Sequence, residues 1–88
     1  MKIRTLKISP IFEKHYKRLP KRIKEQAKEK ERIFLDSPFH PVLRTHKLSG
    51  KEREHWGFWI NYTYRIKFIF TDSNSVLFLD IGLHDIYK

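Results

Sequence analysis

The spacing of apolar residues changes from helical to strand-like near Pro41 of this 88-residue chain and stays strand-like afterwards, which leaves few possible folds. Between Ser9 and Pro41, apolar residues recur at every third or fourth position, as they do on one side of an amphipathic helix. After it, they alternate with polar residues, as they do on a strand with one buried face. Helices followed by consecutive strands predict an α+β fold in which the helices cover one face of a mainly antiparallel sheet. Because the chain is short, we expect one domain over residues 1–88.

Two helices are predicted in the first half of the chain, and a first strand over residues 2–8 precedes them. Ser9 and Pro10 indicate a helix start, because a serine hydroxyl accepts a hydrogen bond from a free backbone N–H and proline suits the first helical position. Pro20 separates the two helices, and the second is expected to end near Asp36. The residues predicted to point inward from these helices are Phe12, Tyr16, Leu19, Ile23, Ala27, Phe34 and Leu35.

About four strands are predicted after the helices, over residues 43–48, 55–61, 64–70 and 76–84. Along the third of them, apolar side chains alternate with Arg65 and Lys67, so the helices should cover the apolar face and leave both cations on the other. In the last strand, the same alternation predicts that the helices cover Leu77, Leu79, Ile81 and Leu83. The open face should then carry Trp59, Val76, Phe78, Asp80, Gly82 and His84.

Basic residues outnumber acidic ones, with 19 Lys and Arg against 10 Asp and Glu, which gives a formal net charge of +9. Such an excess suits a polyanion, because each neutralised phosphate releases counterions. The alternatives are a role in solubility, an acidic protein partner or, less favoured because the second helix has a thin apolar face, an anionic membrane surface. On the open face, cations beside Trp59 and Phe78 are typical of an RNA-binding surface, unless these aromatic side chains merely pack together.

Several classes of protein are excluded or disfavoured by composition. The chain has no cysteine, so it can form neither a disulfide framework nor a thiolate metal site. Its first residues alternate charged with apolar side chains and contain no apolar run of signal-peptide length. No segment approaches the roughly 20 apolar residues of a membrane-spanning helix. We therefore expect a cytoplasmic protein without a membrane partner.

Two of the five histidines, His46 and His84, fall near predicted strand ends, where reactive groups are often exposed beside loops. The other histidines are expected to be structural or solvent-facing. No histidine pair has a metal-ligand spacing such as H-E-x-x-H, so we expect neither a metal nor another cofactor.

Four segments, taken in order and with their spacing, resemble the RelE/ParE toxin superfamily. They are His46-Lys47-Leu48-Ser49-Gly50, Trp56-Gly57-Phe58-Trp59-Ile60, Tyr64-Arg65-Ile66 followed by Phe68, and Asp80-Ile81-Gly82 with His84-Asp85-Ile86-Tyr87. The resemblance spans nearly the whole chain and implies a RelE-like fold. Most members are toxins of type II toxin–antitoxin pairs, and many cleave messenger RNA, often while it occupies the ribosome.

The resemblance also implies roles for individual residues. Arg65 matches the family's recurrent catalytic arginine, which contacts the scissile phosphate. His84 matches a position where members place arginine or histidine on the acid side of the reaction, and His46 resembles a histidine that some subfamilies use for acid–base work. Tyr87 is similar to a C-terminal tyrosine that stacks on or orients the substrate, although its spacing after Gly82 is shorter than in some members.

One departure from the family pattern favours histidine chemistry. The lysines that RelE itself carries before its Tyr-Arg-Leu segment fall here near Gly57 and Trp59, so a lysine-dependent mechanism is not expected. Cleavage through the RNA 2′-hydroxyl needs a base, a positive charge for the phosphorane and an acid for the leaving oxygen. Histidine suits both proton roles because its reference pKa is about 6.5.

The predicted mechanism is that of a metal-independent endoribonuclease. His46 is assigned as the base, Arg65 as the phosphate clamp and His84 as the acid, and the roles of the two histidines are interchangeable at this stage. The residues predicted to hold RNA are Lys47, Trp59, Lys67 and Tyr87.

Two other functions remain open from the sequence. One is a ParE-like toxin that inhibits a topoisomerase without cutting RNA, and the other is a catalytically inactive member that only binds a partner. The expected partners of the nuclease are messenger RNA and the ribosome. The resemblance further implies a small antitoxin, encoded adjacently, and the chain's positive charge makes an acidic antitoxin reasonable.

Overall fold

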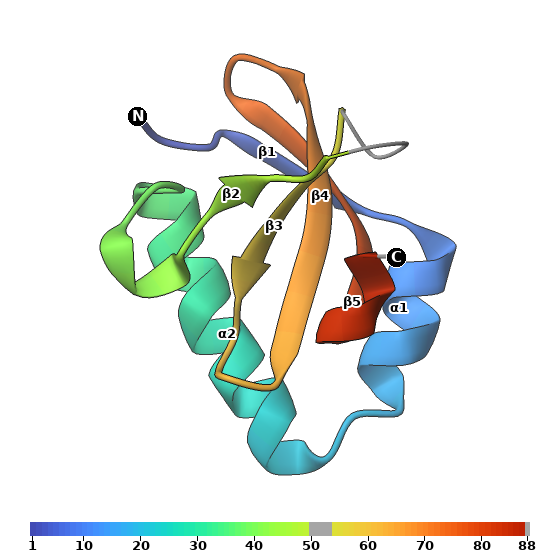
Figure 1. Cartoon of the computed structure of the whole chain (residues 1–88). Coiled ribbons are helices and arrows are strands. Elements are labelled where there is room, and N and C mark those ends of the chain that lie inside the picture. The colour runs from blue at the N-terminus through green and yellow to red at the C-terminus, as the bar shows by residue number, and fades with distance from the viewer. Residues whose placement is uncertain (50–53, 88) are drawn as a thin grey trace.

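The computed structural model describes residues 1–49 and 54–87 and contains two α-helices and a five-stranded sheet (Figure 1). The helices are α1 (Pro10–Lys17) and α2 (Lys21–Asp36). The strands are β1 (Thr5–Ile8), β2 (His46–Lys47), β3 (Trp56–Trp59), β4 (Tyr64–Asp72) and β5 (Ser75–Leu83), and their spatial order is β1-β5-β4-β3-β2. β1 runs parallel to β5, whereas all other neighbours are antiparallel. The predicted α+β fold is confirmed.

The start of α1 forms as the sequence predicts. Ser9 Oγ accepts a hydrogen bond of 3.0 Å from the Phe12 N–H, and Pro10 occupies the first helical turn. The same hydroxyl donates a hydrogen bond of 2.7 Å to the carbonyl of Leu79, so it also ties the helix start to β5. The first strand is shorter than the predicted range 2–8, because the Ile3 N–H donates to the Leu35 carbonyl at the end of α2 instead of to a neighbouring strand.

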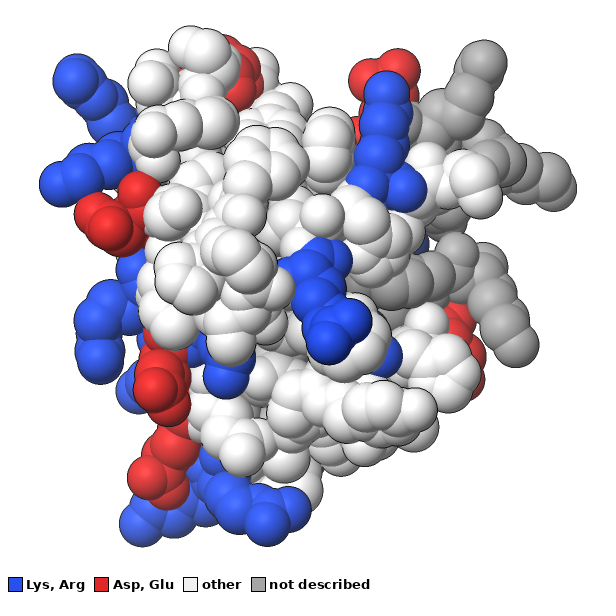
Figure 2. Space-filling model, turned by 60° about the vertical axis from the view of Figure 1, so that its left-hand side comes forward, with Lys and Arg blue, Asp and Glu red and all other residues white. Residues whose placement is uncertain are grey.

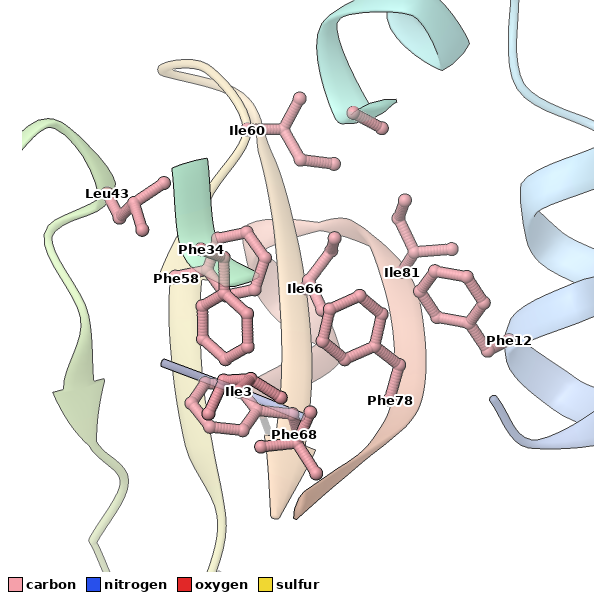
Figure 3. Close-up of a cluster of buried hydrophobic side chains, with 12 residues drawn as sticks. Ile3, Phe12, Phe34, Leu43, Phe58, Ile60, Ile66, Phe68, Phe78 and Ile81 are labelled. Atoms are coloured by element: carbon pink, nitrogen blue, oxygen red, sulfur yellow. The ribbon is translucent and has the colours of Figure 1, made fainter. Parts of the chain in front are cut away.

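The core lies between the two helices and one face of the sheet, and Phe34 of α2 is at its centre. Its ring centroid lies 4.6 Å from that of Phe58, 4.9 Å from that of Phe68 and 5.6 Å from that of Phe78. Figure 3 shows these rings grouped together from α2, β3, β4 and β5. Phe12 of α1 also contacts Phe78, at 5.4 Å, so both helices cover the same face of the sheet.

A β-bulge interrupts the pairing of β4 with β5. Lys67 pairs with Asp80 but the next residue, Phe68, pairs with Phe78, which leaves Leu79 without a partner in β4. An extra residue on one strand reverses the side that each following side chain faces. Even-numbered residues of β5 therefore face the core before the bulge, and odd-numbered residues face it afterwards.

This bulge makes the predicted faces of β5 wrong in part. Val76 and Phe78 are buried in the core, although regular alternation placed them on the open face. Beyond the bulge, Ile81 is buried as predicted. Leu77 and Leu79 are only half-buried, and Leu83 is 47% exposed, so none of the three leucines takes the predicted core position.

The predicted strand over residues 43–48 is also much shorter than expected. Pro41–Leu43 forms a single 3-10 turn, η1, and β2 contains only His46 and Lys47. Arg44 lies between them in the left-handed region, with φ 50° and ψ 41°, which ends the turn and interrupts an extended backbone. Among the described residues, no helix has the length and apolar character needed to cross a membrane.

Candidate functional site

The face of the sheet opposite the helices carries two cross-strand rows of side chains. Residues that pair directly in antiparallel strands share one face. The first row is Trp59, Arg65 and Gly82, and the second is His46, Gly57 and Lys67. The consecutive strands β2, β3 and β4 thereby place a histidine, an aromatic ring and two cations on one face.

A shallow hollow of about 430 Å³ lies at one end of these rows. It is lined by His46, Arg65 and His84, together with Trp59 and Arg44. The three residues predicted to be catalytic come from β2, from β4 and from the turn that follows β5, and the hollow brings them together.

Arg65 is held rigidly in this hollow and is more buried than its place on an open face suggested, with only 8% of its surface exposed. Its guanidinium carbon lies 4.0 Å from the centroid of the Trp59 ring, in a cation–π contact. Its Nη1 group donates hydrogen bonds of 2.8 Å to the Asn61 carbonyl and 3.2 Å to the Tyr64 carbonyl. Within the described chain these bonds use Nη1 alone, so the Nε and Nη2 donors remain for a ligand.

The hydrogen bond of His46 determines which of its nitrogens carries a proton. Nδ1 lies 2.9 Å from the Arg44 carbonyl oxygen. A carbonyl can only accept, so Nδ1 must donate, and in the neutral ring Nε2 then carries the lone pair. The exposed His46 ring can therefore accept a proton at Nε2.

His84 begins the 3-10 turn η3 (His84–Tyr87), which folds back over the end of β5. Gly82 makes this close packing possible, because a Cβ atom at this position would lie 2.9 Å from Cγ2 of Ile86. The glycine thus positions the turn that carries His84.

A Gly82→Ala substitution is expected to lower the free energy of unfolding by about 1 kcal/mol, because the added methyl group forces Ile86 to move. Denaturant unfolding of Gly82→Ala, Ile86→Ala and the double variant measures the coupling between the two positions. The alanine at position 82 should cost much less when Ile86 is already alanine. An equal cost in both backgrounds would show that the two side chains do not compete for space.

Of the four residues predicted to bind RNA, Lys47 and Lys67 are not among the described residues that line the hollow. Lys47 pairs with Trp56, whose side chain packs against the core, so Lys47 leaves β2 on the face of the helices. Lys67 lies in the row of His46 but does not line the hollow. Tyr87 ends the described part of the chain, and its side chain lies outside the described residues.

Asp80 faces α1 instead of the hollow. Its Oδ1 atom lies 2.6 Å from Nδ1 of His15 and also accepts the backbone N–H of Ile81 at 2.7 Å. His15 therefore joins α1 to β5, as a boundary residue rather than as part of the hollow.

Sequence reasoning missed Arg44, whose guanidinium carbon lies 4.6 Å from the Trp59 ring centroid. The signal for it was its spacing. Arg44 precedes His46 by two positions, and Trp59 follows Gly57, the partner of His46, by two positions. Extending the antiparallel register therefore places Arg44 opposite Trp59.

A second hollow, of about 500 Å³, lies between the helices and the sheet. Its lining is mainly apolar, and its charged members are Lys28, Glu31 and Arg32. Burial raises the pKa of Glu31, and the nearby charge of Lys28 opposes part of that rise. Among the described residues that line this hollow there is no histidine, so the smaller hollow around Arg65 is the better candidate for chemistry.

On one face of the molecule, positive charge does not form one continuous patch. Figure 2 shows lysine and arginine side chains along the rim of this face, interrupted by acidic side chains, with few basic groups in its centre. The exposed cations of α2 belong mainly to a solvated surface, as their helical spacing predicts. The site is distinguished by the way in which the Trp59 ring holds Arg44 and Arg65.

No protein-family model matches the sequence, and no curated protein matches it either. Similar solved structures do exist. The YoeB/ParE toxin from Agrobacterium tumefaciens has a TM-score of 0.78 and 18% identity, over 92% of this chain and 99% of that one. YafQ from E. coli strain BL21(DE3) has a TM-score of 0.74 and 22% identity, over 94% and 96% of the two chains. The archaeal RelE–RelB complex from Pyrococcus horikoshii OT3 gives 0.73 and 18%, over 94% and 96%. The chain therefore has the fold of the RelE/ParE toxin superfamily, as its four characteristic segments predict.

Proposed function

We propose that this protein is the toxin of a toxin–antitoxin pair and a metal-independent endoribonuclease that cleaves messenger RNA in the ribosomal A site. The observation that carries the proposal is the meeting of His46, Arg65 and His84 around one hollow. These three residues come from separate segments, and together they supply the groups that cleavage through the 2′-hydroxyl requires. The likeness in fold to the YoeB/ParE toxin and to RelE in its complex with RelB supports the toxin part of this proposal.

In the proposed reaction, Nε2 of His46 removes the proton of the 2′-hydroxyl, whose oxygen then attacks the adjacent phosphorus. The guanidinium of Arg65 stabilises the negative charge that develops on the phosphorane. His84 donates a proton to the departing 5′-oxygen as the P–O bond breaks. The products are a 2′,3′-cyclic phosphate and a 5′-hydroxyl, so the reaction consumes no water and needs no metal ion.

The structure favours one of the two assignments of the histidines. The hydrogen bond from Nδ1 of His46 to the Arg44 carbonyl identifies Nδ1 as the protonated nitrogen, so the lone pair of the neutral ring is on Nε2, as a base requires. His84 lies on the far side of Arg65 in the sheet order, beyond β5. A base and an acid on opposite sides of the phosphate suit a displacement in which the entering and leaving oxygens are in line.

The His46→Ala and His84→Ala variants are each expected to lower the cleavage rate by about 10² to 10⁴-fold, because each removes one proton-transfer group. The wild-type rate should be bell-shaped against pH. His46→Ala, which loses the base, should remove the rise of the cleavage rate with pH on the acidic side. His84→Ala, which loses the acid, should remove the fall of the rate with pH on the alkaline side. Single-turnover cleavage of messenger RNA on programmed ribosomes, measured over a range of pH, tests this.

His40→Asn is the matched control for those variants. The asparagine removes an exposed histidine that does not line the hollow but keeps an acceptor for the Val42 N–H. This control should retain the wild-type rate and pH profile. If His46→Ala and His84→Ala behave like the control, the histidine mechanism is wrong. Growth arrest upon expression without new RNA ends would instead support the alternative of a toxin that does not cut RNA.

An acidic antitoxin is the proposed partner. Solved structures of similar fold include the archaeal RelE–RelB complex and the YoeB–YefM complex from Staphylococcus aureus, and another is described as the toxin–antitoxin complex RelBE2 from Mycobacterium tuberculosis. The formal charge of +9 on the present chain makes a negatively charged partner electrostatically favourable.

A further inference from the structure

Arg44 and Arg65 share a single aromatic ring. Their guanidinium carbons lie 4.6 Å and 4.0 Å from the centroid of Trp59, and both side chains line the hollow. The two guanidinium carbons therefore cannot be further apart than the sum of these distances. This limit keeps the two cations close enough to meet successive phosphates of one RNA strand.

The described part of the chain places no ion-pair partner on either cation, Arg44 or Arg65. Like charges at this distance repel each other, and a cation–π contact with one ring offsets that repulsion only in part. Two anionic groups, one for each guanidinium, would complete the electrostatics of the hollow.

The backbone of Arg44 is also unusual. It is the single non-glycine residue with positive φ in the described chain. This left-handed conformation is strained for an arginine, whereas glycine adopts it freely. The conformation places the Arg44 carbonyl against Nδ1 of His46 while its side chain reaches Trp59. Arg44 therefore contacts His46 through its backbone and Trp59 through its side chain.

We propose that Arg44 is a second phosphate-binding residue, so that the site holds two successive phosphates of single-stranded RNA. Arg65 takes the scissile phosphate and Arg44 takes its neighbour. Trp59 then acts as the positioning residue for both guanidinium groups, and not as a platform on which a base stacks. This inference rests on the proposed function in taking RNA as the ligand, but it concerns binding and is tested without cleavage.

The test measures binding of a fluorescent single-stranded RNA whose 2′-hydroxyls are methylated, so that the strand cannot be cleaved. Arg44→Gly is the informative variant, because glycine keeps the left-handed backbone and the carbonyl beside His46 while it removes the guanidinium. We expect affinity to fall about 10-fold, since a charge-assisted bond to phosphate is lost. The slope of log affinity against log salt should fall by about 0.7, the value for one phosphate of a single strand.

The control is Arg22→Ala, which removes one exposed arginine from the first turn of α2, outside the hollow. It should leave both affinity and salt slope close to the wild-type values. Arg44→Asn provides a second variant if Arg44→Gly folds poorly, because asparagine also tolerates the left-handed region. Wild-type affinity and slope in either Arg44 variant would overturn the inference, as would a wild-type protein that does not bind the strand.

Kinetics distinguish this inference from the proposed nuclease function. On a cleavable substrate, Arg44→Gly should raise KM and leave kcat nearly unchanged, because a contact with the neighbouring phosphate is equal in the ground and transition states. If the wild type cleaves no RNA but Arg44→Gly still loses affinity and slope, the nuclease proposal fails and the two-phosphate site stands. If the wild type cleaves RNA and Arg44→Gly binds like the wild type, the nuclease proposal stands and the two-phosphate site fails.

Discussion

Replacing Arg65 with alanine is expected to lower the rate of RNA cleavage by about 10³-fold, which corresponds to about 4 kcal/mol of transition-state stabilisation. The expectation follows from how the side chain is held. Trp59 and two backbone carbonyls fix the guanidinium before RNA arrives, so little reorganisation is needed when the phosphorane forms. Single-turnover cleavage on programmed ribosomes is the measurement, and kcat should fall much more than KM changes.

Two further variants separate the phosphate clamp from general charge and from folding. Arg65→Lys keeps the charge but loses the planar fork and its stacking on Trp59, so it should restore only part of the rate. Arg22→Ala, with the same loss of charge elsewhere, should cleave normally. Denaturant unfolding should show a loss of about 2 kcal/mol for Arg65→Ala, because two hydrogen bonds from Nη1 and the contact with the Trp59 ring are removed. Full activity of Arg65→Ala would refute the proposed mechanism.

The largest loss of stability is expected from Phe34→Ala, at about 3 to 5 kcal/mol. Phe34 is 0% exposed and its ring packs against those of Phe58, Phe68 and Phe78, so three strands would border the cavity. Protein interiors are closely packed, so the neighbours of this ring cluster (Figure 3) cannot fill the space by small movements. Urea or guanidinium unfolding monitored by circular dichroism measures the loss.

Phe39→Ala is the matched control, since the same atoms are removed from a ring that is 51% exposed. Phe39 contacts Trp56 and Phe70 at the rim of the sheet, at 5.6 Å and 6.2 Å between centroids. Its loss should cost about 1 kcal/mol, because half of its surface already meets water. Similar costs for the two variants would mean that Phe34 does not organise the core.

The sequence predicts most of the fold because most of its elements follow local rules. Ser9 caps α1, Pro20 separates the helices, and the apolar stripe of β4 faces the core with Arg65 opposite. The prediction of which β5 side chains face the core was wrong in part, because the alternation of residues along one strand does not reveal a bulge. The bulge at Leu79 depends on how β5 pairs with a strand that precedes it, and a parity count along one strand has no access to that pairing.

The sequence predicts those site residues that lie within a recognisable sequence motif. Arg65, His46 and His84 lie in the segments that resemble the superfamily, and the structure gathers them around one hollow. Arg44 belongs to none, and its importance depends on the register between β2 and β3, which Arg44 does not itself enter. The sequence does not predict its left-handed backbone either, because arginine has no preference for that region and the η1 turn imposes the conformation.

The parallel pairing of β1 with β5 affects when the protein can become active. Thr5 pairs with Ser75, and β1 lies at the edge of the sheet beside the last strand (Figure 1). Contacts between such distant residues close a long loop and form late in folding. During synthesis, β1 leaves the ribosome first but has no partner until β5 follows. A nascent chain therefore cannot complete its sheet, or place His84 beside Arg65, before nearly all of it has been translated.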